Sequence, residues 1–86
     1  MNPNFQKSLK QAREKQILGN YDESIAEYKV VLVWIKEYIT KEVKDPQMRQ
    51  KWKQVNEAIQ KELEMAKETN ALKQQFKAMM GPNQNY

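Results

Sequence analysis

The chain has 86 residues, a formal net charge of +4, two glycines, and neither cysteine nor histidine. This length suits one small domain. The two missing residue types exclude disulfides, thiolate metal sites, and the usual general base and transition-metal ligand. The longest wholly apolar run, residues 30–35, is too short to span a bilayer, and the N-terminus lacks an apolar signal core. We therefore expect a soluble, intracellular, helical domain without direct membrane insertion.

The first predicted helix runs from about Asn4 to Leu18. Asn2 is placed to cap it, and Pro3 suits the first helical position because no N–H is needed there. Helical spacing gives this segment an inner stripe with Ile17 on its flank. The stripe comprises Phe5, Leu9, Ala12 and Gln16.

A sharp turn is predicted after the first helix. Gly19 can adopt the left-handed conformation that ends a helix, Asn20 is a favourable N-cap, and Glu23 would complete a capping box. Small side chains and aromatic rings should let the flanking helices pack closely; these residues are Ala12, Ser24, Tyr21 and Tyr28. The pattern is typical of a tetratricopeptide-like hairpin, here in a single copy.

The second predicted helix runs from about Tyr21 to Val43. Its buried stripe is expected to comprise Ile25, Tyr28, Leu32, Ile35 and Ile39, widened by Val31 and Tyr38. A stripe of this width indicates that the helix contacts two neighbours.

The third predicted helix begins at Pro46 and should be capped by Asp45. It either continues to Met79 or breaks at residues 69–70, where Thr and Asn side chains compete for backbone hydrogen bonds. Gly81-Pro82 then ends it. Its buried face is expected to comprise Met48, Trp52, Val55, Ile59, Leu63 and Ala66.

These elements predict an all-α fold. We expect an antiparallel, up-down-up three-helix bundle over residues 1–80 with a long third helix, followed by the start of a linker at 81–86. Five residues are expected to have structural roles at the turn and in the core, namely Ala12, Gly19, Tyr21, Tyr28 and Trp52.

Basic side chains form a ribbon along one flank of the third helix. At about 100° per residue, Arg49, Lys53 and Lys67 fall within a narrow angle, while Lys10 and Arg13 lie on a flank of the first helix. An ordinary solvated face is one interpretation. A ribbon that binds an acidic polymer, such as tubulin with its glutamate-rich tails, is the other. Nucleic acid is not expected, because no stacking aromatic residue lies among the basic positions. We predict that these five residues bind an acidic polymer of this kind.

Two apolar strips fall outside the buried stripes. The first comprises Val30, Val33 and Trp34, on a face of the second helix that a three-helix bundle should expose. The second lies on the last part of the third helix and comprises Met65, Leu72 and Phe76. Either the helices are buried more widely than expected, or these strips contact another chain. We predict partner binding by Val30, Val33, Trp34, Leu72 and Phe76.

No catalytic, cofactor-binding or metal-binding residue is predicted. A phosphate-binding loop of the form G-x-x-x-x-G-K-[ST] is absent, since the two glycines stand alone at positions 19 and 81. Glu62 and Glu64 point apart on a helix and are expected to form solvated ion pairs.

Several motifs follow one another at set distances, namely Ala12-Arg13-Glu14, Leu18-Gly19-Asn20-Tyr21-Asp22, Val31-Leu32, Asp45-Pro46, and Lys51-Trp52 with Gln54 and Val55. Over residues 5–77 they resemble the amino-terminal domain of katanin catalytic subunits, a variant of the MIT (microtubule interacting and trafficking) three-helix bundle. The Lys-Trp-x-Gln-Val motif is the most specific of them. In that family the domain precedes a flexible linker and an AAA ATPase module that severs microtubules.

The resemblance implies a non-catalytic domain that binds microtubules and the helical carboxy-terminal domain of a regulatory subunit. The predicted microtubule-binding residues are then the five basic ones, namely Lys10, Arg13, Arg49, Lys53 and Lys67. It also implies a cytoplasmic, cytoskeleton-associated protein whose ATPase lies in sequence outside these residues. Two other functions fit the residues: an MIT-type peptide-binding adaptor of a membrane-remodelling ATPase, and a plain oligomerisation bundle.

Overall fold

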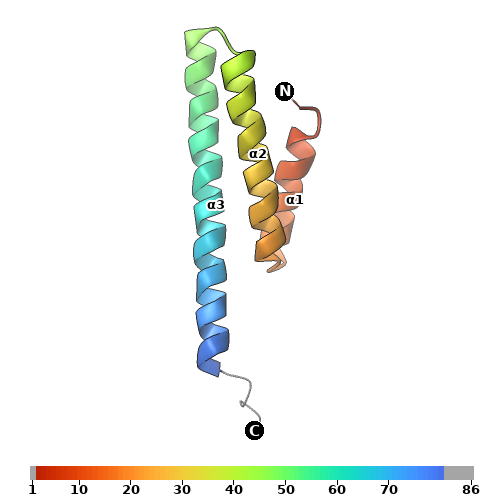
Figure 1. Ribbon diagram of the computed structural model, residues 1–86, viewed down its shortest axis with the longest axis vertical. Coiled ribbons are helices and arrows are strands. Elements are labelled where there is room, and N and C mark those ends of the chain that lie inside the picture. Colours follow the sequence, from red (N-terminus) through yellow and green to blue (C-terminus); the bar gives the residue numbers. More distant parts are fainter. Residues whose placement is uncertain (1, 81–86) are drawn as a thin grey trace.

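In the computed structural model, residues 2–80 are described and form three helices, α1 (Phe5–Ile17), α2 (Tyr21–Lys41) and α3 (Pro46–Met80). The helices run antiparallel in succession, with α2 between α1 and α3 (Figure 1). This arrangement confirms the predicted all-α three-helix bundle. The predicted linker and the helix stop at Gly81-Pro82 lie outside the described residues.

The turn between α1 and α2 confirms the role predicted for Gly19. This residue has a φ of 83°, in the left-handed region. Its N–H donates to the Gln16 carbonyl at 3.1 Å, and the Asn20 N–H donates to the Lys15 carbonyl at 2.8 Å. These two bonds form a Schellman motif, which satisfies carbonyl groups that the end of α1 would otherwise leave unpaired.

The capping box predicted at the start of α2 does not form. The Asn20 side chain makes no capping hydrogen bond, and its backbone (φ −85°, ψ 67°) departs from the extended conformation typical of an N-cap. Glu23 lies 3.6 Å from the Lys15 ammonium group instead. The backbone of Asn20 is already held by the end of α1, which sets the direction of its side chain.

The N-terminal segment also differs from its prediction. Asn2 Oδ1 accepts a hydrogen bond from the Asn4 N–H at 2.8 Å, and the Asn2 carbonyl accepts one from the Phe5 N–H at 3.1 Å. Asn2 therefore closes a turn that contains Pro3, and α1 begins two residues after that proline rather than at it.

The start of α3 follows the prediction closely. Pro46 is its first residue, and Asp45 Oδ1 accepts a hydrogen bond from the Gln47 N–H at 3.1 Å. Helix α2 ends at Lys41, slightly before the predicted Val43, but Val43 remains buried in the connection.

The core lies where α2 faces its two neighbours, and it contains most of the residues predicted for it. Buried apolar residues from all three helices form one cluster: Ala12, Tyr28, Val31, Leu32, Ile35, Ile39, Ile59, Leu63 and Ala66. Phe5, Leu9, Ile25 and Trp52 are partly buried against this cluster. The Ser24 hydroxyl, fully buried, donates to the Ala12 carbonyl at 2.7 Å, so these small residues allow close approach of α1 and α2.

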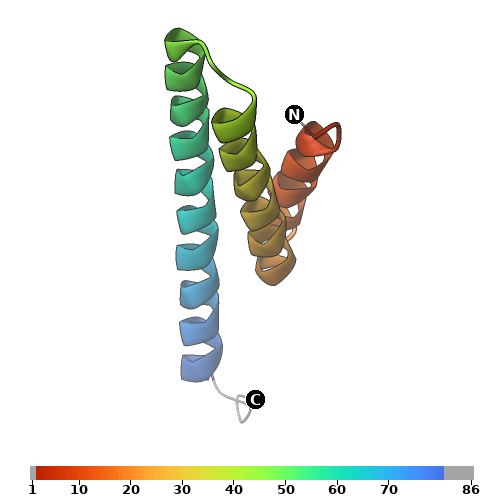
Figure 2. The same cartoon turned by 45° about the horizontal axis from the view of Figure 1, so that its top comes forward.

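Trp52 links the end of the bundle where α1 begins. Its ring centroid is 6.1 Å from that of Phe5 and 5.1 Å from that of Tyr38, both in edge-on geometry. Figure 2 shows α1 leaning away from α3. These two helices meet through long side chains, with Phe5 against Trp52 and Arg13 paired with Glu62.

Three residues predicted to be buried or flanking the core are exposed. Ile17 is 84% exposed because it lies about 140° around the axis of α1 from the buried Ala12. Met48 precedes the part of α3 that α1 reaches, and Val55 lies to one side of the inward face. Asn56 occupies the inward position beside Val55 and is half-buried.

Helix α3 continues without the alternative break at residues 69–70. The Thr69 hydroxyl donates back to the Met65 carbonyl at 2.8 Å, which keeps this side chain compatible with the helix. At about 1.5 Å per residue α3 is about 50 Å long, and its last turns extend beyond the α1–α2 turn (Figure 1). We call residues 71–80, all of which are exposed, the overhang.

Candidate functional site

The seam between α2 and α3 is marked at both ends by a side-chain contact on the same side. Near the α2–α3 connection, Arg49 Nη1 donates to the Val43 carbonyl oxygen at 2.9 Å. Near the α1–α2 turn, Asn70 Nδ2 donates to Asp22 Oδ1 at 3.4 Å. The residues between these two contacts therefore define one open edge of the seam.

Lysines from both helices line this edge. Lys29 and Lys36 follow Asp22 at seven-residue steps, which place them on the same side of α2. On α3, Lys53 and Lys67 lie within about 60° of Arg49 or Asn70 around the helix axis. All four lysines are exposed. We call this set, with Arg49, the basic seam.

Most of the positive charge on the basic seam is uncompensated. Within residues 2–80, no ion pair involves Lys29, Lys36 or Lys53. Lys67 Nζ lies 3.4 Å from Glu64 Oε1, an exposed pair on the same helix. Arg49 is half-buried and is tied to the connection between the helices. The three unpaired lysines are therefore the charges most available to an acidic ligand.

Asn56 lies next to this edge, on the inward face of α3. Its Oδ1 atom is shielded from solvent and accepts no hydrogen bond from the described residues. A buried acceptor without a partner costs roughly 1–3 kcal/mol.

Arg13, one of the predicted microtubule-binding residues, belongs to a network that joins all three helices. Its Nε and Nη2 atoms donate to the two carboxylate oxygens of Glu62, each at 2.8 Å. The Tyr28 hydroxyl lies 2.9 Å from Gln16 Oε1 and 3.2 Å from Glu62 Oε1. A bidentate pair of this kind is stronger and more specific than a single ion contact.

The same network shifts the pKa values of its members. The hydrogen bonds from Arg13 lower the pKa of the Glu62 carboxyl and raise that of the Arg13 guanidinium. Burial, reinforced by the neighbouring Glu62 charge, raises the pKa of Tyr28 to about 12. Arg13 is thus largely committed to the bundle. The ion pairing predicted for Glu62 is confirmed, although its carboxylate is partly buried rather than fully solvated.

Lys10 and Arg13 lie apart from the three predicted residues of α3. Arg13 contacts Glu62, which lies about 140° to 180° around the axis of α3 from Arg49, Lys53 and Lys67. Lys10 is exposed, with its Nζ 3.9 Å from Glu14 Oε1. The five residues therefore do not form one surface, and their binding role stays a prediction.

Lys29 and Lys36 were not predicted as part of the site. Their seven-residue spacing from Asp22 could have indicated a shared side of α2, but the sequence does not say which side of α2 borders the basic flank of α3. The contacts of Arg49 and Asn70 supply that information.

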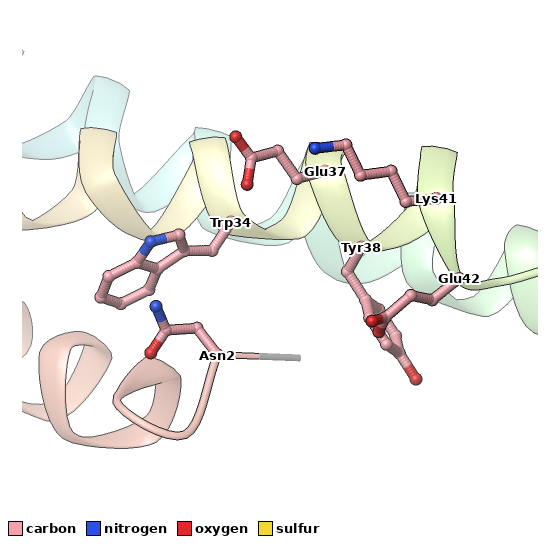
Figure 3. Close-up of a pocket in the computed structure, with 6 residues that line it drawn as sticks. All are labelled: Asn2, Trp34, Glu37, Tyr38, Lys41 and Glu42. Carbon is pink, nitrogen blue, oxygen red and sulfur yellow. The ribbon is translucent and has the colours of Figure 1, made fainter.

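The predicted partner strip on α2 lies only partly in the open. Val30 and Val33 are exposed, whereas Trp34 is half-buried. Trp34 lines a surface cavity of about 330 Å³ together with Asn2, Glu37, Tyr38, Lys41 and Glu42. Figure 3 shows the Asn2 side chain beside the Trp34 indole, so the N-terminal segment covers part of this ring.

The second partner strip is fully open. Leu72 and Phe76 are exposed in the overhang, where α3 has no helix beside it (Figure 1). Among the described residues, Lys73 supplies the main contact between the overhang and the α1–α2 turn. Its Nζ donates to the Gly19 carbonyl at 3.2 Å and lies 5.5 Å from the centre of the Tyr21 ring.

The part of the chain that the structure describes is residues 2–80. No group of three or more acidic residues is arranged to hold a metal ion there. No helix in this part of the chain is both long and apolar enough to cross a membrane.

Comparison with known proteins gives a consistent result. The family described as the MIT domain of the katanin p60 A1 subunit matches residues 6–69. Proteins described as A-like 1 forms of the katanin p60 ATPase-containing subunit are 34% identical in Homo sapiens and Papio anubis, and 32% identical in Rattus norvegicus. Each of these matches covers 76 residues, which are 88% of this chain but only 15% of the relative. No solved structure matches the chain significantly.

Proposed function

This chain belongs to the family of katanin p60 MIT domains, and from that premise we propose that it recruits a katanin-like microtubule-severing ATPase to its substrate. In this proposal the domain is non-catalytic, and it binds both the microtubule and the helical carboxy-terminal domain of a regulatory subunit. Microtubule binding is supported by the basic seam, which has three lysines that form no ion pair in the described chain.

A row of lysines on one edge of a rigid bundle suits an acidic polymer. Exposed charges interact over about 10 Å at 0.1 M salt, so a surface with many carboxylates can engage several lysines at once. The glutamate-rich tails and outer surface of tubulin are such a surface. Arg49 contributes less to this binding, because its guanidinium group already holds the connection between α2 and α3.

Microtubule co-sedimentation of charge-reversed variants tests this part of the proposal. The variant Lys29→Glu, Lys36→Glu, Lys53→Glu removes the unpaired charges of the basic seam. The control Lys7→Glu, Lys51→Glu, Lys61→Glu makes the same change in net charge at exposed positions elsewhere. We expect the first variant to lose at least about tenfold in affinity, equivalent to about 1.4 kcal/mol, and the control to lose much less.

The control variant also decides between a specific surface and net charge. Equal losses for the two variants would show that net charge alone drives binding, and the basic seam would be rejected as the site. Binding by the unmodified chain should also weaken steeply between low and physiological salt. Unfolding of either variant is checked by circular dichroism, since surface changes usually cost within about 0.5 kcal/mol.

For the regulatory subunit, we propose the outer face of α2 as the docking surface. Val30 and Val33 are exposed beside Trp34, and apolar groups of this kind favour a protein partner. Val30→Asp with Val33→Asp should abolish binding of a regulatory-subunit helical domain in calorimetry. The exposed Gln50→Asp, on the side of α3 that faces away from α2, should bind as before. Unchanged affinity of the double variant would exclude this face.

A further inference from the structure

The outer face of α3 carries an apolar stripe that no part of the described chain covers. Its four apolar members are well exposed: Met65 by 60%, Leu72 by 64%, Phe76 by 63% and Met79 by 81%. With Thr69, they follow one another at steps of four, three, four and three residues. This spacing is the heptad pattern of a coiled-coil seam, in which two helices pack side by side.

The stripe is separate from the face that α3 uses within the bundle. Around the helix axis, its centre lies about 130° from the buried residues Ile59, Leu63 and Ala66. It begins beside the bundle and continues down the overhang, where α3 has no neighbouring helix (Figure 1). Helix α3 can therefore pack in its own bundle and accept another helix at the same time.

We propose that the stripe pairs with the same stripe of a second copy of this chain, with the two α3 helices parallel. The charges that flank the stripe support this occupant and this direction. Glu68 is the last position of one heptad, and Lys73 follows Leu72 in the next. Both positions border the stripe, and they are five residues apart. In a parallel pair, Glu68 of each copy faces Lys73 of the other, which gives two opposite-charge contacts.

An antiparallel pair is disfavoured by the same residues. It brings like positions together, so the alignment that packs Leu72 against Phe76 of the second copy places Lys73 opposite its own counterpart. Lys73 already donates to the Gly19 carbonyl from an exposed position. Because an ammonium group has three donors, it can keep that bond while approaching a carboxylate.

The length of the stripe limits the strength of the pairing. From Met65 to Met79 it is about 21 Å long, or two heptads, which is short for a stable coiled coil. We therefore expect a weak dimer that depends on concentration. Where the domain binds an acidic polymer, as proposed above, a dimer would carry two basic seams and gain affinity through bivalency.

Sedimentation equilibrium over a range of concentrations tests the pairing. The mass of the chain should rise from monomer towards dimer, and Leu72→Asp with Phe76→Asp should keep it monomeric without unfolding it. Ala78→Asp, an exposed overhang position outside the stripe, is the matched control and should still dimerise. The basic-seam variant Lys29→Glu, Lys36→Glu, Lys53→Glu should dimerise as well, so this test does not depend on microtubule binding.

Charge reversal and cross-linking test the direction of the pair. Glu68→Lys or Lys73→Glu alone should weaken dimerisation about tenfold, and the two together should restore it. Because the chain has no cysteine, Met79→Cys reports on a single position. A parallel pair brings these two sulfurs together, so oxidation should cross-link Met79→Cys far faster than Ala78→Cys.

Three results would overturn the proposal. One is a monomeric mass at every concentration. Another is equal cross-linking of Met79→Cys and Ala78→Cys. The third is a chain that stays monomeric and binds a regulatory-subunit helical domain through the stripe, so that Leu72→Asp with Phe76→Asp abolishes this binding. That result would assign the stripe to the other partner.

Discussion

The two ends of α3 are parts of one continuous helix but differ in what holds them. In the first part, Trp52, Ile59, Leu63 and Ala66 pack into the core. In the overhang every residue is exposed, and Lys73 supplies its main described contact with the rest of the chain. An isolated helix of about ten residues is marginal in water. The overhang stays helical because the packed part supplies the costly nucleus and each further residue then adds a hydrogen bond.

Composition supports this extension of the helix. The overhang, residues 71–80, contains Ala, Leu, Lys, Gln, Phe and Met and no glycine, proline or β-branched residue. Most of these are among the best helix formers. Burial therefore stabilises the first part of α3, while local helix propensity suffices in the overhang. Function can therefore be placed on the overhang at little cost to the fold.

The largest difference in stability is expected when an aromatic ring is removed from the core and, separately, from the overhang. Tyr28→Ala should destabilise the chain by about 3–5 kcal/mol, because Tyr28 is fully buried in the core. Phe76→Ala should change the free energy of unfolding by less than about 0.5 kcal/mol, because Phe76 is exposed. Urea denaturation of dilute protein measures both. Similar losses would show that the overhang folds back on the core.

A second test uses pH to probe Tyr28 in the packed core. The pKa of Tyr28 is raised to about 12, so the folded state keeps this proton longer than the unfolded chain. The resulting stability is complete below about pH 10 and is lost as the pH rises from about 10 to about 12. Tyr28→Phe lacks the hydroxyl and should not show this part of the loss. If both proteins lose stability equally over this range, Tyr28 does not titrate as inferred.

Glu62 gives the opposite sign at acid pH. Its folded pKa is lowered, chiefly by the hydrogen bonds from Arg13. The stability it contributes is present above the unfolded carboxyl pKa of about 4.3 and is lost as the pH falls through the folded value. Melting temperatures of the unmodified chain and Glu62→Gln should therefore converge in acid. A constant difference down to about pH 2 would show that the pair does not titrate in this way.

A third test addresses the turn that the overhang passes. Gly19 has positive φ, and a Cβ at this position would meet no atom within 4 Å, so backbone strain alone opposes substitution. Gly19→Ala should cost about 1–2 kcal/mol, and the β-branched Gly19→Val should cost more. Equal melting temperatures for both variants and the unmodified chain would place the helix end elsewhere.

The smallest expected effect concerns the contact between turn and overhang. Lys73→Met keeps the apolar stem but removes the ammonium group that reaches the Gly19 carbonyl and the Tyr21 ring. Global stability should fall by about 0.5 kcal/mol or less, while amide hydrogens of the overhang should exchange faster. Unchanged exchange there would show that this contact does not help to order the overhang.

Helix ends and apolar stripes could be predicted from the amino-acid sequence, because they depend mainly on residues close together in the chain. Gly19 ends α1 because a left-handed residue is needed there, and Asp45 with Pro46 starts α3 because each fits its terminal position. The spacing of apolar residues likewise identified the wide stripe of α2. The failure at Asn20 is also local in kind, since two capping motifs competed for one backbone position.

The rotation of each helix about its axis, and the contacts between long side chains, depend on how the helices pack and could not be predicted from the sequence. A small rotation of α3 exposes Val55 and brings Asn56 inward, and periodicity alone does not fix that angle. The pairing of Arg13 with Glu62 joins residues 49 positions apart, and it balances the charge of one predicted site residue. The basic seam exists for the same reason, because lysines on separate helices become neighbours only once the crossing of α2 and α3 is set.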